Sequence, residues 1–126
     1  MTRSLLAVAC SLAVLAGSTG LASAHANLVR SNVKNNQVFR YGHTPRQIDG
    51  FFAENLLPKS SWMAVFEGVA DHGMVSVKHS HVNFQNPKEM VLPLPRLARG
   101  KYYFIWYTKS ADDNHIAAGI VYFRVR

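Results

Sequence analysis

The sequence has 126 residues, 48% of them hydrophobic and 17% charged, with eight Gly and five Pro. This profile predicts one ordinary globular domain and excludes a second one, and the chain contains neither internal repeats nor a low-complexity linker. The formal net charge is +7, but the Lys and Arg residues are scattered singly and form no basic run. The charge pattern therefore argues against a nucleic-acid-binding protein.

The first 24 residues predict a secretory signal peptide. An almost uninterrupted apolar run from Leu5 to Ala16 follows Arg3 and leads to the small residues 22–24 (ASA). The run is too short to span a bilayer, which needs roughly 20 apolar residues. We therefore expect residues 1–24 to be removed and residues 25–126 to form a soluble, exported domain. Cys10 would leave with the signal, so this domain would be stabilised by its core without a disulfide.

Short apolar stretches recur every ten residues or so in the remaining chain, and none has a sustained helical period. This pattern predicts an all-β sandwich or barrel. In chain order, the predicted strands are residues 47–52, 62–69, 74–79, 90–94, 101–107 and 121–126.

The last two of these strands have the clearest patterns. Residues 101–107 (KYYFIWY) are apolar on both faces, as expected of a central strand. In the final strand, Val121, Phe123 and Val125 alternate with more polar residues and should face the core. The large aromatic residues expected in the core are Trp62, Tyr102 and Trp106.

Three residues form a candidate metal site. If the signal is cut after Ala24, His25 provides a free α-amine and an imidazole that can chelate one ion. Asp113 and His115 lie two residues apart in a polar break between the two best strands, so in a locally extended chain both side chains would project from one face. An incidental His in an Asp- and Asn-rich loop is the alternative. An amine, two imidazoles and a carboxylate, without thiolate, favour Cu(II).

With these residues, the chain resembles the CopC/PcoC family of periplasmic copper-resistance proteins over nearly its whole mature length. The opening residues 25–31 (HANLVRS) and residues 52–56 (FAENL) are similar to two of the family's motifs. The closing part is similar to the family's pattern of Gly, Tyr, Trp, Ser, Asp-x-His, Gly and Phe, which is matched here by Gly100, Tyr102, Trp106, Ser110, Asp113, His115, Gly119 and Phe123.

The resemblance implies a seven-stranded Greek-key β-sandwich or barrel, immunoglobulin-like with cupredoxin-like topology. It implies a periplasmic protein, not an enzyme, that sequesters or transfers copper as a monomer with one Cu(II) per mature chain. The implied ligands are His25, Asp113 and His115, with Glu54 and His72 as additional candidates. An inner-membrane transporter of the CopD type is the implied partner. Many relatives carry a methionine-rich loop, but residues 67–75 lack a Met-x-x-Met run, so we expect no tight Cu(I) site.

Two other interpretations remain open on the residues alone. A histidine-brace copper oxidase of the lytic-monooxygenase kind also begins at an N-terminal His, although a carboxylate such as Asp113 would favour Cu(II) over the Cu(I) that must react. A metal-free immunoglobulin-like interaction module is the other. His79 and His81 form a His-x-His pair on a predicted strand, and we interpret it as a surface pair in preference to a secondary metal site.

Overall fold

The computed structural model describes residues 26–68, 73–76 and 78–126. The predicted signal peptide and the residue that follows it lie outside these ranges. Within them there is no helix with the length and apolar character needed to cross a membrane. The described strands are β1 (Leu28–Ser31), β2 (Gln37–Phe39), β3 (Gln47–Phe52), β4 (Trp62–Glu67), β5 (His81–Asn83), β6 (Asn86–Pro93), β7 (Gly100–Lys109) and β8 (Ile116–Val125).

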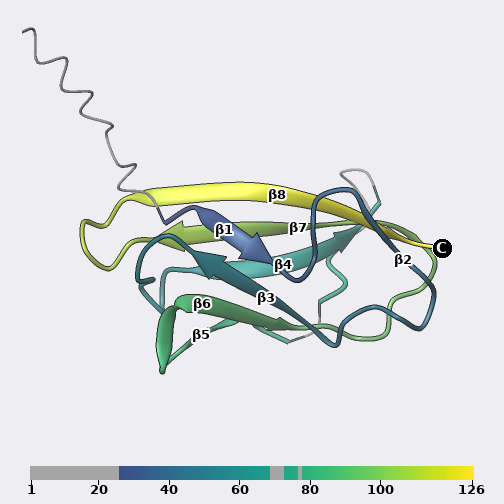
Figure 1. Ribbon diagram of the computed structural model, residues 1–126, viewed down its shortest axis with the longest axis horizontal. Coiled ribbons are helices and arrows are strands. Elements are labelled where there is room, and N and C mark those ends of the chain that lie inside the picture. Colours follow the sequence, from purple (N-terminus) through teal and green to yellow (C-terminus); the bar gives the residue numbers. More distant parts are fainter. Residues whose placement is uncertain (1–25, 69–72, 77) are drawn as a thin grey trace, which may run out of the picture.

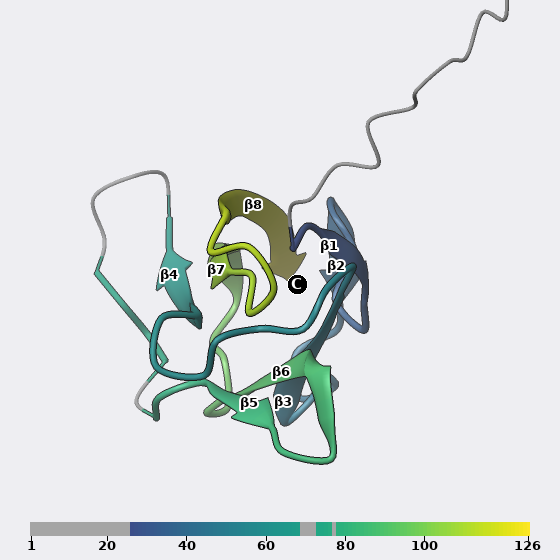
Figure 2. The same cartoon turned by 90° about the vertical axis from the view of Figure 1, so that its left-hand side faces the viewer.

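The strands form two four-stranded sheets, ordered β1-β3-β6-β5 and β2-β8-β7-β4. Figure 1 shows the long β7 and β8 running the length of the molecule, and Figure 2, seen from one end, shows the sheets as two layers. The chain alternates between the sheets for its first five strands, so most neighbours in a sheet are distant in sequence. This arrangement confirms the predicted β-sandwich.

The strand count differs from the seven implied by the family resemblance, because the described residues form eight. The sequence analysis predicts none of β1, β2 and β5, which have only three or four residues each, too few to show an alternating pattern. The predicted strand at residues 74–79 is wrong: there Met74 makes an isolated bridge to Phe66, while His79 lies outside any strand. The predicted strand 47–52 matches β3 at both ends, and the remaining predicted strands are present with shifted ends.

The core lies between the sheets and is built from alternate residues of the long strands. Val121, Phe123 and Val125 are buried as predicted, and the facing residues of β7 are buried with them. Trp106 crosses over Gly119 so closely that a Cβ there would lie 2.5 Å from the indole ring, which explains the glycine. The ring also meets Phe52 from the other sheet edge-to-face at 5.6 Å.

Trp62 corrects the prediction that all large aromatics lie in the core. It is 43% exposed and stacks on Tyr107 on the outer face of its sheet. The pattern misled because β7 carries aromatic residues on both faces, while within the described residues no third layer covers the outer one. Its apolar outer side chains pack against those of β4 and β8 instead.

Tyr102 fixes the start of β7. Its hydroxyl donates a hydrogen bond of 2.6 Å to the Ala98 carbonyl, four residues earlier, as in the tyrosine corner of other β-sandwiches. Burial raises the pKa of the Tyr102 phenol, and the negative charge of Glu67 raises it further. The neutral phenol therefore keeps the hydrogen bond that joins the start of β7 to the preceding loop.

Candidate metal centre

The predicted site residues Asp113 and His115 lie in the turn that joins β7 to β8. Ser110 closes this turn, since its amide donates to the His115 carbonyl at 2.9 Å and its own carbonyl accepts from the Asn114 amide at 3.0 Å. Asn114 adopts a φ of 61°, a left-handed conformation that asparagine tolerates better than most residues. The local sequence therefore encodes a tight reversal of the chain.

Asp113 and His115 approach each other directly. The His115 Nδ1 atom lies 3.0 Å from the Asp113 Oδ2 atom, and the Asp113 Oδ1 atom accepts a 3.1 Å hydrogen bond from the His115 amide. The Asp113 side chain is 31% exposed and the His115 side chain is 55% exposed, so an ion can reach them. The expected proximity is found, but it arises from a side-chain-closed turn and not from the extended backbone that the sequence argument assumed.

Glu54 is tied to the same turn from the opposite sheet. It lies in the loop after β3, and its Oε2 atom accepts a hydrogen bond from the hydroxyl of the fully buried Ser110. The Ala111 amide donates to the Asn55 carbonyl at 2.8 Å, and Leu56 forms an isolated bridge with Ser110. The structure thus brings Glu54 to the base of the turn, where its carboxylate braces Ser110.

The start of the described chain is fixed at this end of the sandwich. Ala26 is completely buried, and its carbonyl accepts a 2.7 Å hydrogen bond from the hydroxyl of Thr108 on β7. The Asn27 carbonyl accepts from the Ala53 amide at 2.9 Å. His25, the predicted N-terminal ligand, precedes Ala26 but lies outside the described residues. The chain therefore enters the fold beside Thr108, two residues before Ser110.

Among the described residues, the other histidines are not assembled with this pair. His72 lies outside the described residues. His79 and His81 are both exposed, but only His81 belongs to a strand, so the expected placement of the pair on one strand is wrong. Among residues 26–68, 73–76 and 78–126, no group of three or more His, Cys, Asp or Glu side chains could hold a metal ion. Met63 and Met90 are buried in the core, as expected from their strands.

Sequence reasoning missed the roles of two buried hydroxyls, Ser110 and Thr108. Thr108 lies on the inner face near the end of β7 and Ser110 directly follows the strand, and both are buried where apolar residues would ordinarily stand. Each satisfies its hydroxyl with a partner from another segment, the Glu54 carboxylate and the Ala26 carbonyl, respectively. The signal in the sequence was the position of these two small polar residues, which continue the alternation of inward-facing residues along an apolar strand.

Chemically, this end of the molecule offers nitrogen and oxygen donors. An imidazole and a carboxylate held close together on an exposed turn are ligands that Cu(II) accepts, and no thiol is present among the described residues. Their fixed geometry comes from backbone and side-chain hydrogen bonds that exist in the chain without any metal. The fold and the turn together define a β-sandwich with a candidate metal centre at one end.

Comparison with solved structures identifies the kind of sandwich. The fold matches CopC from Methylosinus trichosporium OB3b with a TM-score of 0.70 at 24% sequence identity, over 80% of this chain and 93% of that one. It matches PcoC, a methionine-rich copper resistance protein from Escherichia coli, with a TM-score of 0.66 at 29% identity, over 82% and 100% of the two chains. The selenomethionine form of PcoC matches with a TM-score of 0.62 at 28% identity, over 79% and 99%.

These neighbours confirm the resemblance to the CopC/PcoC copper-resistance proteins, and the chain has their β-sandwich fold. Neither the protein-family models nor the curated protein sequences give a match.

Proposed function

We propose that the protein binds one Cu(II) ion per mature chain in the periplasm, where it sequesters copper or passes it on without a catalytic cycle. The observation that carries this proposal is the exposed Asp113–His115 pair, held on a turn of the CopC/PcoC fold. The neighbouring PcoC is named as a copper resistance protein, which supports a copper-handling role for this chain. We further propose that residues 1–24 are the export signal and residues 25–126 the copper-binding domain.

The proposed ligand set is His25, Asp113 and His115. The Asp113 carboxylate lies at the His115 Nδ1 atom, so His115 would hold the ion through Nε2 while this contact is kept, and Asp113 would bind the ion directly only after releasing Nδ1. While the contact is kept, Asp113 has two functions, since it orients the imidazole and adds negative charge beside the cation. Glu54 is a supporting residue that holds Ser110 through one of its two carboxylate oxygens.

His25 completes the set through its α-amine and imidazole once the signal has been removed. Support for this assignment comes from the next residue, because Ala26 is buried and bonded to Thr108, near the base of the turn. We also propose a CopD-type transporter as the destination of the copper, and this part rests on the family resemblance alone.

The test compares two preparations in a competitive Cu(II) titration against a chelator of known affinity. One is the exported protein beginning at His25, verified by intact mass, and the other carries one additional residue before His25. The extension converts the amine into an amide, a much poorer donor, so we expect a large loss of affinity with an unchanged fold. Equal affinities would show that the terminal amine is not a ligand.

A non-enzymatic role has its own measurement. The copper-loaded protein should release no more peroxide in the presence of ascorbate than the same concentration of free Cu(II), whereas sustained peroxide production would favour the histidine-brace oxidase. Retention of one copper after dialysis is also expected. Its complete loss would favour the metal-free interaction module.

A further inference from the structure

The end of the sandwich opposite the candidate metal centre carries seven of the protein's 14 Lys and Arg residues. We define the basic pole as the exposed Lys and Arg residues of the loop after β2, the loop between β6 and β7, the start of β7 and the end of the chain. In Figure 1 this is the end marked by the C-terminus, and the β7–β8 turn lies at the other end. Its members are Arg40, Arg46, Arg96, Arg99, Lys101, Arg124 and Arg126.

Contacts between these segments show that the charges share one surface. The guanidinium groups of Arg96 and Arg99 lie 4.9 and 4.8 Å from the centre of the Tyr41 ring. The Tyr41 amide donates to the Arg126 carbonyl at 2.7 Å, which ties the loop after β2 to the last residue of the chain. Lys101 and Arg124 are direct partners on neighbouring strands, a like-charge pairing that costs stability.

Carboxylates do not neutralise this surface. Among the described residues, no carboxylate lies within ion-pair distance of any cation of the basic pole. Glu67 is the acidic side chain at its edge, beside Gly100 and close enough to Tyr102 to raise the phenol's pKa. Glu54, Asp112 and Asp113 all belong to the opposite end. The charge distribution is therefore strongly one-sided.

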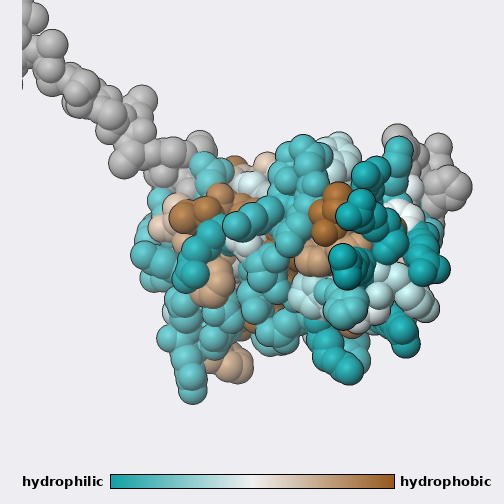
Figure 3. Space-filling model, turned by 45° about the vertical axis from the view of Figure 1, so that its right-hand side comes forward, coloured by the Kyte–Doolittle hydropathy of each residue, from teal (hydrophilic) through white to brown (hydrophobic). Residues whose placement is uncertain are grey.

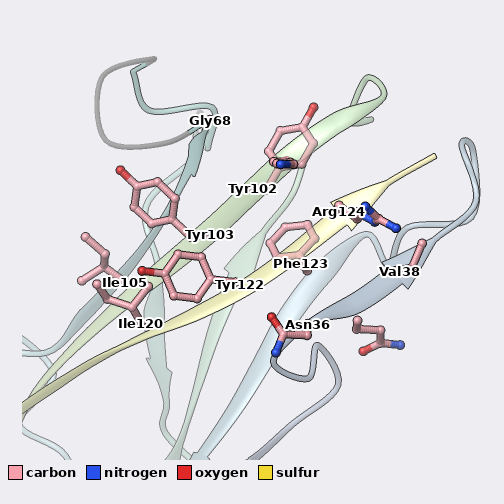
Figure 4. A pocket seen from close by; sticks show the side chains of 12 residues that line it. Asn36, Val38, Gly68, Tyr102, Tyr103, Ile105, Ile120, Tyr122, Phe123 and Arg124 are labelled. Atoms are coloured by element: carbon pink, nitrogen blue, oxygen red, sulfur yellow. The ribbon is translucent and has the colours of Figure 1, made fainter.

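Apolar and aromatic side chains are exposed between the cations. Val38, Tyr41 and Tyr122 are 40%, 41% and 52% exposed, and Val38 lies directly beside Arg124 in the β2–β8 pairing. Figure 3, with this end turned forward, shows hydrophobic side chains emerging among hydrophilic ones. A groove of about 580 Å³ begins near Arg124 and continues over Tyr122 and Ile120, as Figure 4 shows.

We propose that the basic pole docks on membranes rich in anionic phospholipids. Arg and Lys side chains attract the headgroup phosphates, and each contributes about fivefold in affinity when it is near an anionic surface. Tyr side chains favour the lipid–water interface, where the ring contacts apolar atoms and the hydroxyl stays hydrated. A second cavity of about 380 Å³, lined by Arg46 and Arg96, provides room for a headgroup phosphate.

Membrane docking fits this surface better than an acidic protein partner does. The cations lie on four separate segments around exposed Tyr and Val side chains. This arrangement suits a membrane surface, where charged headgroups cover apolar acyl chains. Docking by this end would leave the β7–β8 turn directed away from the bilayer. The proposal involves no copper ligand and holds whether or not the metal centre binds Cu(II).

The test is co-sedimentation of the exported, signal-free protein with vesicles of phosphatidylglycerol and phosphatidylcholine. We expect binding to mixed vesicles, little binding to pure phosphatidylcholine and a marked loss on raising the salt concentration, which screens the attraction. The double variant R96E/R99E should bind at least about 30-fold more weakly. The matched control K59E/K88E has the same net charge, with both changes on exposed residues away from the pole.

The control separates docking by the pole from general attraction of a basic protein. Equal losses in the two double variants, or equal binding to both vesicle types, would overturn the proposal. Circular dichroism of each variant shows that the fold is retained. If R96E/R99E does not fold, the single variants R46E and R99E carry the same comparison. Inorganic phosphate at matched ionic strength should not release the protein, and release would assign the pole to free phosphate instead.

Discussion

The β7–β8 hairpin combines two regions with different tasks, its paired strands and its turn. The strands contribute Phe104, Trp106 and Val121 to the core, where each residue is held by apolar neighbours from both sheets. The turn contributes Asp113 and His115, which are exposed and held by hydrogen bonds within the turn itself. Stability and the proposed metal binding are therefore separable along one hairpin, and Ser110 is the residue at which they meet.

The largest loss of stability is expected from Trp106→Ala. The ring is buried between Gly119 and Phe52, so its removal leaves a large cavity in the core. We expect the free energy of unfolding to fall by about 3–5 kcal/mol in denaturant titrations. Trp62→Ala is the matched control, because Trp62 is half exposed and only stacks on Tyr107. A loss no greater than that of the control would place Trp106 outside the core.

A smaller effect is expected from Ser110→Ala, at the junction of the two regions. The change leaves the Glu54 carboxylate without its hydroxyl donor, which should cost about 1–3 kcal/mol. Glu54→Gln and the double variant complete a thermodynamic cycle, and we expect the double variant to lose less than the sum of the two single changes. Additive losses would mean that the hydrogen bond contributes nothing to holding the turn.

The sequence predicts the strand part of the hairpin far better than its turn. Alternation along residues 121–125 identifies the buried face correctly, because a strand with one face against the core places every second side chain inside. The short strands β1, β2 and β5 escape prediction, since three or four residues give no period to detect. Trp62 is placed wrongly because an apolar outer face has the same pattern as an inner one.

For the candidate site, the sequence indicates which residues are candidates but does not predict their geometry. Asp113 and His115 stand out because a polar break separates two strong strands, and their proximity was expected. The cause of that proximity, a turn closed by Asp113 with Asn114 in a left-handed conformation, depends on backbone angles that residue types only bias. The partnership of Glu54 and Ser110 joins positions 56 residues apart, which no local pattern encodes.

The titration of Tyr102 gives the stability of the strand region a pH dependence. Burial raises the pKa of the phenol and Glu67 adds to the shift, so the folded state holds its proton more tightly than the unfolded state does. Stability from this group is full below pH ~10, where the unfolded phenol keeps its proton, and is lost as the pH rises from there through the folded pKa. Tyr102→Phe should remove this part of the alkaline decline in urea titrations.

The matched control for that measurement is Tyr122→Phe, on the exposed face of β8. It should keep the alkaline decline of the unmodified protein. If both variants keep it, Tyr102 does not contribute, and the decline comes from other groups.

The smallest change in stability, with the largest change in metal binding, is expected from Asp113→Ala and His115→Ala. Both side chains lie on the surface, so the free energy of unfolding should change by less than about 1 kcal/mol. Cu(II) affinity should fall by at least about 10–100-fold in chelator competition, because a ligand or the group that orients it is lost. Asp112→Ala is the neighbouring control and should leave the affinity unchanged. Unfolding of the Asp113 variant together with a fully stable Trp106 variant would reverse the assignment of core and site on this hairpin.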